Sequence, residues 1–342
     1  MNLADLNKVA LAMVTPGKGI LAADESSGTI KKRFDAIGVE NTEDHRRDYR
    51  EMMFRTGEAM SKYVSGVILY DETIRQKAKD GTPLVKLIEQ AGAIPGIEVD
   101  EGTQTLPQCP GELVTVGLDK LAERLKKYYD QGARFAKWRA VIDIGSNVPT
   151  MTAIHVNAHA LARYAALCQA AQIVPIVEPE VLMDGGHDID RCYEVSMRLL
   201  NKTFQELRVQ RVALEGMILK PNMAISGKKC AKQSSVDEVA EKTIRLLKSC
   251  VPAAVPGIAF LSGGQSDTDA TAHLDAMNRI GGLPWRLTFS YGRALQAAPQ
   301  KAWSGKAENA AAGQRAFTHR ARMNSLATEG EWQADLEKQK AA

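Results

Sequence analysis

Two lysines stand inside apolar stretches of the chain, where lysines are uncommon. Lys137 lies in the stretch FAKWR, and Lys220 lies in MILKPN. Because lysine is rarely buried unless it is paired, each could be an ion-pair partner or a nucleophile. If the fold brings the two ammonium groups together, their repulsion and their burial lower the pKa of one of them. A neutral amine attacks carbonyls to form a Schiff base, so the pair predicts covalent carbonyl catalysis.

Other charged and polar residues end apolar stretches in the same way. The ends of these stretches are Asp24, Asp71, Asp100, Arg139, Glu180, Lys220, Ser262 and Ser290. Glu178 stands two residues before Glu180 in the stretch VEPE. Carboxyl groups beside a reactive amine can donate and accept protons, so these residues predict acid–base chemistry at the same site.

Two glycine-containing segments predict a phosphate site. They contribute Ser262, Gly263 and Gly264 from FLSGGQS, and Ser290, Gly292 and Arg293 from SYGRALQ, where a helix is expected to begin. Glycine N–H groups and helix N-termini both favour anions, although each segment alone is also typical of an ordinary tight turn. A second basic group, Lys31, Lys32 and Arg33, follows SSGT and is equally compatible with a solvated helix face.

The elements that must position these residues alternate along the chain. Eight apolar stretches are predicted to be buried strands: residues 19–24, 64–71, 96–100, 134–139, 173–180, 216–221, 257–263 and 286–292. Their polar ends recur about every 38 residues, which suits one strand, one helix and two loops. Residues 119–132, 153–171 and 235–250 show helical periodicity. Alternating strands and helices predict parallel strands with right-handed crossovers.

Eight such units without a break in composition favour an α/β fold of one domain, a (β/α)8 TIM barrel, over an open sheet. The carboxyl ends of barrel strands meet on one face, where enzymes of this fold place their active sites. We therefore expect the charged residues to form one site. A short amphipathic helix precedes the barrel, and a polar, less ordered tail is expected over about residues 320–342.

Composition narrows the classes of function. Hydrophobic residues are 44% and charged residues 25%, which excludes a disordered, collagen-like or coiled-coil chain. The net charge of +3 is unclustered and does not predict nucleic-acid binding. No apolar run has membrane-spanning length, no signal peptide is recognisable, and the five cysteines are scattered, so we expect a soluble cytoplasmic protein with reduced thiols.

Three motifs suggest other chemistry but fit it poorly. GKGILA (17–22) precedes a strand, whereas a dinucleotide fingerprint follows one. His155 and His159 lack the glutamate of a metalloprotease motif, so a structural pair is expected. His187 in DGGHDID is expected to stabilise its own loop. The sequence therefore predicts neither a metal site nor a cofactor.

Six segments together resemble a known family. They are LAADESSGT (21–29), AKWR (136–139), VEPE (177–180), ILKPNM (218–223), FLSGGQS (260–266) and TFSYGRALQ (288–296). In this order, over about residues 6–320, the chain resembles class I (Schiff-base) fructose-1,6-bisphosphate aldolase. The resemblance implies a metal-independent lyase of glycolysis and gluconeogenesis, usually a homotetramer. Such an enzyme reversibly cleaves fructose 1,6-bisphosphate to dihydroxyacetone phosphate and glyceraldehyde 3-phosphate.

The resemblance also implies a role for each matching residue. Lys220 would attack the C2 carbonyl, and Lys137 would lower its pKa and orient the substrate. Glu178 would dehydrate the carbinolamine, and Asp24 would take the C4 hydroxyl proton. Glu180 and Arg139 would hold these groups in geometry. Ser262, Gly263 and Arg293 would bind the C1 phosphate, and Gly264, Ser290 and Gly292 would make further substrate contacts. Arg33, with Ser26 or Lys32, would bind the C6 phosphate, and Glu25 and Gln296 would make secondary contacts.

Two departures from the family pattern leave the substrate open. The family usually has a lysine in the third strand, whereas GIEVDEG (96–102) carries Glu98 and Glu101 around Asp100. Glu98 would either repel a phosphate or pair with Lys137. The animal members end in a tyrosine that aids proton exchange, whereas this sequence ends in EKQKAA. A fructose 1-phosphate or sedoheptulose bisphosphate aldolase, and a non-catalytic phosphate-binding or scaffolding protein, are therefore alternatives.

Overall fold

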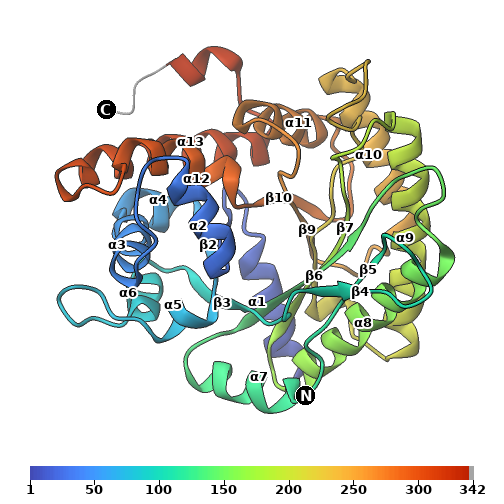
Figure 1. Cartoon of the computed structure of the whole chain (residues 1–342), viewed down its shortest axis with the longest axis horizontal. Helices are drawn as coiled ribbons and strands as arrows, with labels where there is room; N and C mark the ends of the chain where they lie inside the picture. Colours follow the sequence, from blue (N-terminus) through green and yellow to red (C-terminus); the bar gives the residue numbers. More distant parts are fainter. Residues whose placement is uncertain (339–342) are drawn as a thin grey trace.

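The computed structural model describes residues 1–338 and shows a closed barrel of eight parallel strands (Figure 1). The strands are β1 (Gly19–Ala23), β2 (Val64–Leu69), β3 (Ile94–Glu98), β6 (Phe135–Ile142), β7 (Val174–Val181), β8 (Ile218–Leu219), β9 (Gly257–Phe260) and β10 (Arg286–Tyr291). Around the barrel they run β1-β10-β9-β8-β7-β6-β3-β2. Each of the eight predicted strands has its counterpart, which confirms the (β/α)8 barrel.

Helices surround the barrel, as Figure 1 shows. They are α1 (Leu3–Met13), α2 (Ser27–Asp35), α3 (Glu43–Phe54), α4 (Gly57–Lys62), α5 (Asp71–Arg75), α6 (Leu84–Gln90), α7 (Leu121–Asp130), α8 (Met151–Ala170), α9 (Ile189–Val209), α10 (Val236–Cys250), α11 (Asp267–Ile280), α12 (Arg293–Trp303) and α13 (Ala310–Glu329). Short 3-10 turns occur at Leu214–Gly216, Ala307–Asn309 and Ala334–Lys338. No helix among residues 1–338 is long and apolar enough to cross a membrane.

The pleat of the strands separates an apolar barrel floor from a charged barrel mouth. Successive side chains of a strand point to opposite faces. On β6, Phe135 packs into the inner apolar cluster, whereas Ala136 and Trp138 pack into the outer core under the helices. Lys137 and Arg139 are on the same inward-facing side of β6 as Phe135, and they lie nearer to the barrel mouth. The same alternation on β7 continues from Val174 and Ile176, which are buried in the floor, to Glu178 and Glu180.

Helix α1 closes the floor of the barrel. Its buried residues Leu6, Ala10 and Met13 pack with inward strand residues such as Phe135. Gly96 on β3 makes room for this ring, because an added Cβ there would lie 2.2 Å from it. The floor is therefore sealed by apolar packing, and the charged groups are confined to the other end.

Three features differ from the elements expected from the sequence. A two-stranded hairpin, β4 (Thr103–Thr105) with β5 (Leu113–Thr115), follows β3 outside the barrel. The strand β8 is two residues long, so Lys220 follows the strand instead of ending it. The expected start of the polar tail, near residue 320, lies inside α13, where Arg320 and Phe317 are buried. Residues 339–342 of that tail lie outside the described residues.

Candidate active site

A cavity of about 1190 Å³ opens at the carboxyl ends of the barrel strands. Most of the predicted site residues line it: Asp24, Ser26, Arg33, Lys137, Arg139, Glu178, Glu180, Lys220, Ser262, Gly263, Gly264, Ser290, Gly292 and Arg293. Glu25, Glu98 and Asp100 line it as well. The fold therefore brings together residues that lie up to about 270 positions apart in the sequence.

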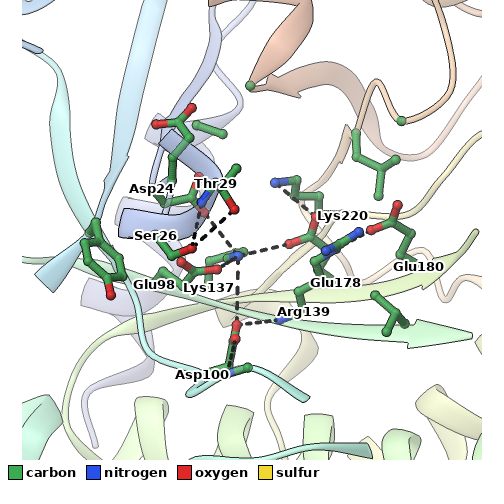
Figure 2. Close-up of a pocket in the computed structure, with 18 of the residues that line it drawn as sticks. Asp24, Ser26, Thr29, Glu98, Asp100, Lys137, Arg139, Glu178, Glu180 and Lys220 are labelled. Carbon is green, nitrogen blue, oxygen red and sulfur yellow. Dashed lines mark hydrogen bonds and ion pairs between the residues drawn. The ribbon is translucent and has the colours of Figure 1, made fainter. Parts of the chain in front are cut away.

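The Lys137 ammonium group lies at the centre of a cluster of carboxyl groups (Figure 2). Its Nζ atom contacts Glu98 Oε1 directly and lies 3.1 Å from Asp24 Oδ2. Glu178 Oε2 is 3.7 Å away and Asp100 Oδ2 is 3.9 Å away. The Lys137 side chain is only 4% exposed, so these charges interact with little screening by water. Of the two roles considered for Glu98, pairing with Lys137 is the one that the geometry shows.

The second lysine has a simpler environment. Lys220 Nζ lies 3.2 Å from Glu178 Oε1, and Lys220 makes no other ion pair among residues 1–338. Glu178 thus stands between the two lysines, with one oxygen toward each. Next to it, the guanidinium of Arg139 pairs with Glu180, and the Arg139 backbone N–H donates to Asp100 Oδ2 at 3.2 Å. These contacts hold the charged ends of β6 and β7 in register.

The cluster shifts pKa values in opposite directions. Burial disfavours the charged form of Lys137, but Asp24, Glu98 and Glu178 outweigh it and raise the pKa of Lys137 well above its usual value. Burial raises the pKa of Glu98 to about 8, against the opposing effect of Lys137. Burial would raise the pKa of Asp24 as well, but the positive charges of the two lysines outweigh it and lower that pKa. The surrounding carboxyl groups therefore hold Lys137 in its charged form.

The residues of one predicted phosphate site come together where the loops after β9 and β10 meet. Ser262 is buried at the cavity wall, and the Ser290 hydroxyl is buried without a hydrogen-bond partner among residues 1–338. Gly264 has a φ of +78°, and a Cβ there would lie 2.1 Å from Met183, so the turn requires glycine. Arg293 begins α12 directly after Gly292 and donates to the Gln265 carbonyl at 3.1 Å. A helix N-terminus, a free hydroxyl and a guanidinium therefore face one region of the cavity.

A second basic region lies at the start of α2. Ser26 caps this helix, its hydroxyl accepting from the Thr29 N–H, and both residues line the cavity. Arg33 pairs with Glu25, and its Nη2 lies 3.5 Å from where a Cβ on Gly292 would be. Lys32, in contrast, is exposed and does not line the cavity. Of the two residues considered together with Arg33 for the C6 phosphate, Ser26 lines the cavity and Lys32 does not.

The remaining sequence motifs lie away from this cavity. His155 and His159 are on the outer surface of α8 and both face Glu206. The segment GKGILA leads into β1 instead of following a strand. Among residues 1–338, no group of three or more histidine, cysteine, aspartate or glutamate side chains is placed to hold a metal ion. The five cysteines are free thiols, and four of them are buried.

Comparisons with known proteins agree with this geometry. The family described as "Glycolytic: Fructose-bisphosphate aldolase class-I" matches residues 5–342. The chain belongs to this family. A probable fructose-bisphosphate aldolase class 1 from Xanthomonas campestris is 57% identical over 333 residues, covering 97% of this chain and 99% of its own. Fructose-bisphosphate aldolase 1 from Toxoplasma gondii is 54% identical over 330 residues, covering 96% and 91%.

A solved structure supports the family assignment at the level of the fold. It is fructose-bisphosphate aldolase from Plasmodium falciparum, in a complex with TRAP and a small molecule inhibitor. The two chains superpose with a TM-score of 0.94 at 47% sequence identity, covering 97% of this chain and 96% of the other. The chain is therefore an aldolase of class I, which makes the alternative of a non-catalytic scaffold unnecessary.

Proposed function

We propose that this aldolase cleaves fructose 1,6-bisphosphate reversibly through a Schiff base on Lys220, without a metal ion. The observation that carries the proposal is the unequal environment of the two buried lysines. Lys137 is surrounded by four carboxyl groups, whereas Lys220 has one ion-pair partner among residues 1–338, Glu178. Because its carboxyl neighbours hold Lys137 in the charged form, Lys220 is the better candidate for the nucleophile.

The bond changes can be assigned to these side chains. The Lys220 nitrogen adds to the C2 carbonyl of the substrate and gives a carbinolamine. Glu178, 3.2 Å from Lys220 Nζ, donates a proton to the C2 hydroxyl, which leaves as water, and a protonated imine remains. Asp24 takes the C4 hydroxyl proton while the electrons of the C3–C4 bond move to C3 and form an enamine. Glyceraldehyde 3-phosphate leaves, and C3 takes up a proton that balances the one Asp24 removed. Water then adds to C2, the bond between C2 and the Lys220 nitrogen breaks, and dihydroxyacetone phosphate and the free amine of Lys220 result.

The other groups position the substrate in this proposal. Lys137 stays charged and holds Asp24 ionised. Arg139 and Glu180 fix the edge of the cluster. Ser262, Gly263, Gly264, Ser290, Gly292 and Arg293 form the end for the C1 phosphate, and Ser26 with Arg33 forms the end for the C6 phosphate. The protonated imine accepts the electrons that a metal ion would otherwise accept, so the mechanism calls for no metal.

Borohydride trapping tests this proposal. Reduction in the presence of dihydroxyacetone phosphate should add a stable mass to the peptide that carries Lys220. Lys220→Met should remove both the adduct and cleavage, whereas Lys228→Met, at another cavity lysine, should still form the adduct. An adduct on Lys137 would exchange the roles of the two lysines. Turnover without any lysine adduct would rule out the Schiff base.

Glu98 supports a second candidate substrate. Its carboxyl group lies in the cavity, paired with Lys137, at a position where the resemblance implies a lysine, so the cavity has one cation fewer for a second phosphate. A monophosphate such as fructose 1-phosphate is therefore the second candidate, with sedoheptulose bisphosphate as a third. The kcat/KM values for fructose 1,6-bisphosphate, fructose 1-phosphate and sedoheptulose bisphosphate, measured side by side, distinguish the three candidates.

We also propose that the enzyme is a homotetramer that works in glycolysis and gluconeogenesis in the cytoplasm. The proposal is supported by the family and by relatives named as cytosolic, such as fructose-bisphosphate aldolase 4 of Arabidopsis thaliana, 52% identical over 324 residues. Light scattering on a gel-filtration peak should give four times the 37.3 kDa chain mass. A peak at one or two chain masses would contradict the tetramer.

A further inference from the structure

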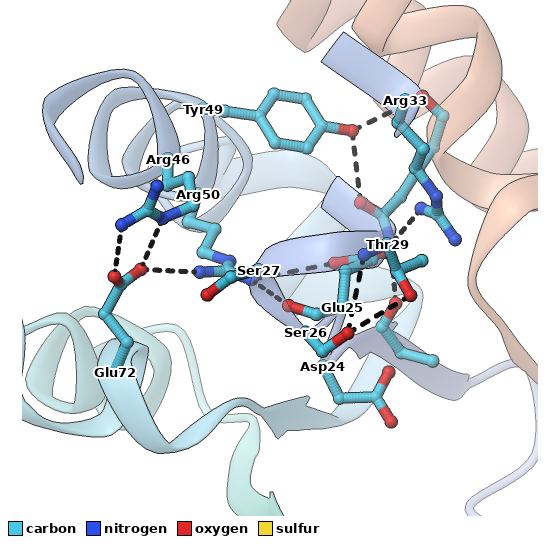
Figure 3. Close-up of polar contacts among 12 residues, drawn as sticks. Asp24, Glu25, Ser26, Ser27, Thr29, Arg33, Arg46, Tyr49, Arg50 and Glu72 are labelled. Atoms are coloured by element: carbon cyan, nitrogen blue, oxygen red, sulfur yellow. Dashed lines mark hydrogen bonds and ion pairs between the residues drawn. The ribbon is translucent and has the colours of Figure 1, made fainter. Parts of the chain in front are cut away.

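A buried arginine lies behind the Arg33 end of the cavity (Figure 3). Arg50 projects from α3, and its side chain is only 1% exposed. Its Nη2 donates to the Glu25 carbonyl oxygen at 3.0 Å and lies 3.9 Å from Glu25 Oε2. Its Nη1 lies 3.5 Å from Glu72 Oε1. Arg50 does not line the cavity, so any effect on substrate must act through another residue.

Glu25 is the residue that connects Arg50 to the cavity. It follows Asp24 in the chain, its side chain is 3% exposed, and it pairs with Arg33. The carboxylate oxygen that contacts Arg33 is Oε1, and it also accepts a hydrogen bond of 2.7 Å from Gln296 Nε2. The other oxygen, Oε2, has no hydrogen-bond partner among residues 1–338 and faces Arg50. Glu25 therefore has two cations, one on the cavity side and one behind it.

Glu72 also lies near Arg50, but it is already paired with Arg46. Arg46 Nε donates to Glu72 Oε1 at 2.8 Å, and Arg46 Nη2 contacts Glu72 Oε2. Because Arg46 neutralises Glu72, the charge of Arg50 remains available to Glu25. The arrangement Arg46–Glu72–Arg50–Glu25–Arg33 thus alternates in sign from α3 and α5 to the cavity.

A phosphate that binds Arg33 has to compete with Glu25 for that guanidinium. Without a second cation, the Glu25 carboxylate would be left buried and unpaired, which is strongly unfavourable. Arg50 is placed to keep Glu25 compensated when Arg33 turns to an anion. We propose that Arg50 is a positioning residue that allows Glu25 to release Arg33 to the substrate phosphate. This inference rests on the proposed function, in which Arg33 binds the C6 phosphate.

The test compares fructose 1,6-bisphosphate with fructose 1-phosphate, which lacks the C6 phosphate. Arg50→Gln should leave Arg33 as the only cation on Glu25, so the KM for the bisphosphate should rise about tenfold, equivalent to about 1.4 kcal/mol. The KM for the monophosphate and both kcat values should change by less than about twofold, since a change of this size is only about 0.4 kcal/mol. Arg50→Lys should recover part of the loss because it keeps the charge.

A double variant separates this role from a purely structural one. In Glu25→Gln with Arg50→Gln, no carboxylate retains Arg33, so the KM for the bisphosphate should return to the value for Glu25→Gln alone. A double variant as impaired as Arg50→Gln would overturn the proposal, because it would show that Arg50 acts by fixing the turn at residue 25. An Arg50→Gln enzyme with an unchanged KM for the bisphosphate would overturn it as well.

Glu25→Gln alone keeps the test available if Arg50→Gln does not fold. Inorganic phosphate, titrated by calorimetry, should bind this variant more tightly than the parent, and Arg33→Ala with Glu25→Gln should lose the gain. Equal or weaker binding would overturn the proposal. Trapping of dihydroxyacetone phosphate on Lys220 is independent of Arg33, so its failure in the parent would instead count against the proposed function.

Discussion

Replacing Lys137 by Met should show how strongly its ammonium group stabilises the charged barrel mouth. The substitution keeps most of the side-chain length and removes a cation that lies within 4 Å of four carboxyl groups. Removing one partner of a buried ion pair typically costs about 3–5 kcal/mol, because the other charge is left uncompensated. We expect a loss of this size in the free energy of unfolding at pH 8, where Asp24 is ionised.

The same substitution should cost less at pH 5. Lys137 is charged at both pH values, because its pKa lies well above its usual value, so only the carboxyl groups supply the pH dependence. Without the ammonium group, burial raises the native-state pKa of Asp24 above that of the unfolded chain, and the pKa of Glu98, already about 8, rises further. The native variant then binds protons that the unfolded chain has released, and its stability falls as pH rises. Each unit by which a carboxyl pKa rises within the range from pH 5 to pH 8 adds about 1.4 kcal/mol to the difference between the two pH values.

Urea unfolding followed by circular dichroism, at one protein concentration and at both pH values, measures this effect. Lys228→Met is the matched control, because Lys228 also lines the cavity, but its one ion-pair partner within residues 1–338 is Asp184, at the exposed rim. This control should lose less than about 1 kcal/mol. The reasoning is refuted if Lys137→Met costs no more than Lys228→Met, or if its cost grows toward pH 5.

Three further predictions concern catalysis. Arg293→Ala should lower kcat/KM by a factor that corresponds to about 2–3 kcal/mol of lost binding free energy, because Arg can make two charge-assisted hydrogen bonds to the C1 phosphate. Unchanged binding of dihydroxyacetone phosphate would place Arg293 outside that site. Turnover should survive exhaustive chelation, and activity that is lost and then restored only by a divalent metal would contradict the Schiff-base mechanism. Glu98→Lys should raise kcat/KM more for fructose 1,6-bisphosphate than for fructose 1-phosphate, as assayed side by side, because it adds a cation to the cavity for the second phosphate. An equal change for both substrates would show that Glu98 acts through its pair with Lys137 alone.

The barrel could be predicted because its signal repeats along the chain. Every strand combines apolar residues with a polar residue at or near its carboxyl end, and the spacing leaves room for one helix each time. The inward positions of β6, Phe135, Lys137 and Arg139, alternate with outward Ala136 and Trp138, as a pleated strand requires. The hairpin β4–β5 has no such repeat, since its strands are three residues long and mostly exposed.

The choice between Ser26 and Lys32 could not be made from the sequence. Both are close to Arg33 in the chain, but direction around a helix, not chain distance, decides which residue faces the cavity. Ser26 caps α2 at the end nearest the barrel mouth, whereas Lys32 is exposed. Arg50 was missed for a related reason. The sequence of its helix, α3, is mostly charged and predicts an exposed helix. The one sequence feature that pointed to a buried Arg50 was its place among the apolar residues Tyr49, Met52 and Met53, which are buried.

The different environments of Lys137 and Lys220 arise only when the barrel closes. In the sequence both lysines look alike, since each interrupts an apolar stretch. The closed barrel sets Lys137 on β6 beside β3, so Glu98 and Asp100 reach it from one side and Glu178 from the other, while Asp24 approaches from β1 across the mouth. Lys220, after β8, has one ion-pair partner among residues 1–338, Glu178. Because nearby carboxylates favour the charged form of an amine, the order of the strands around the barrel keeps Lys137 charged, and this difference between the two lysines underlies the proposal that Lys220 is the nucleophile.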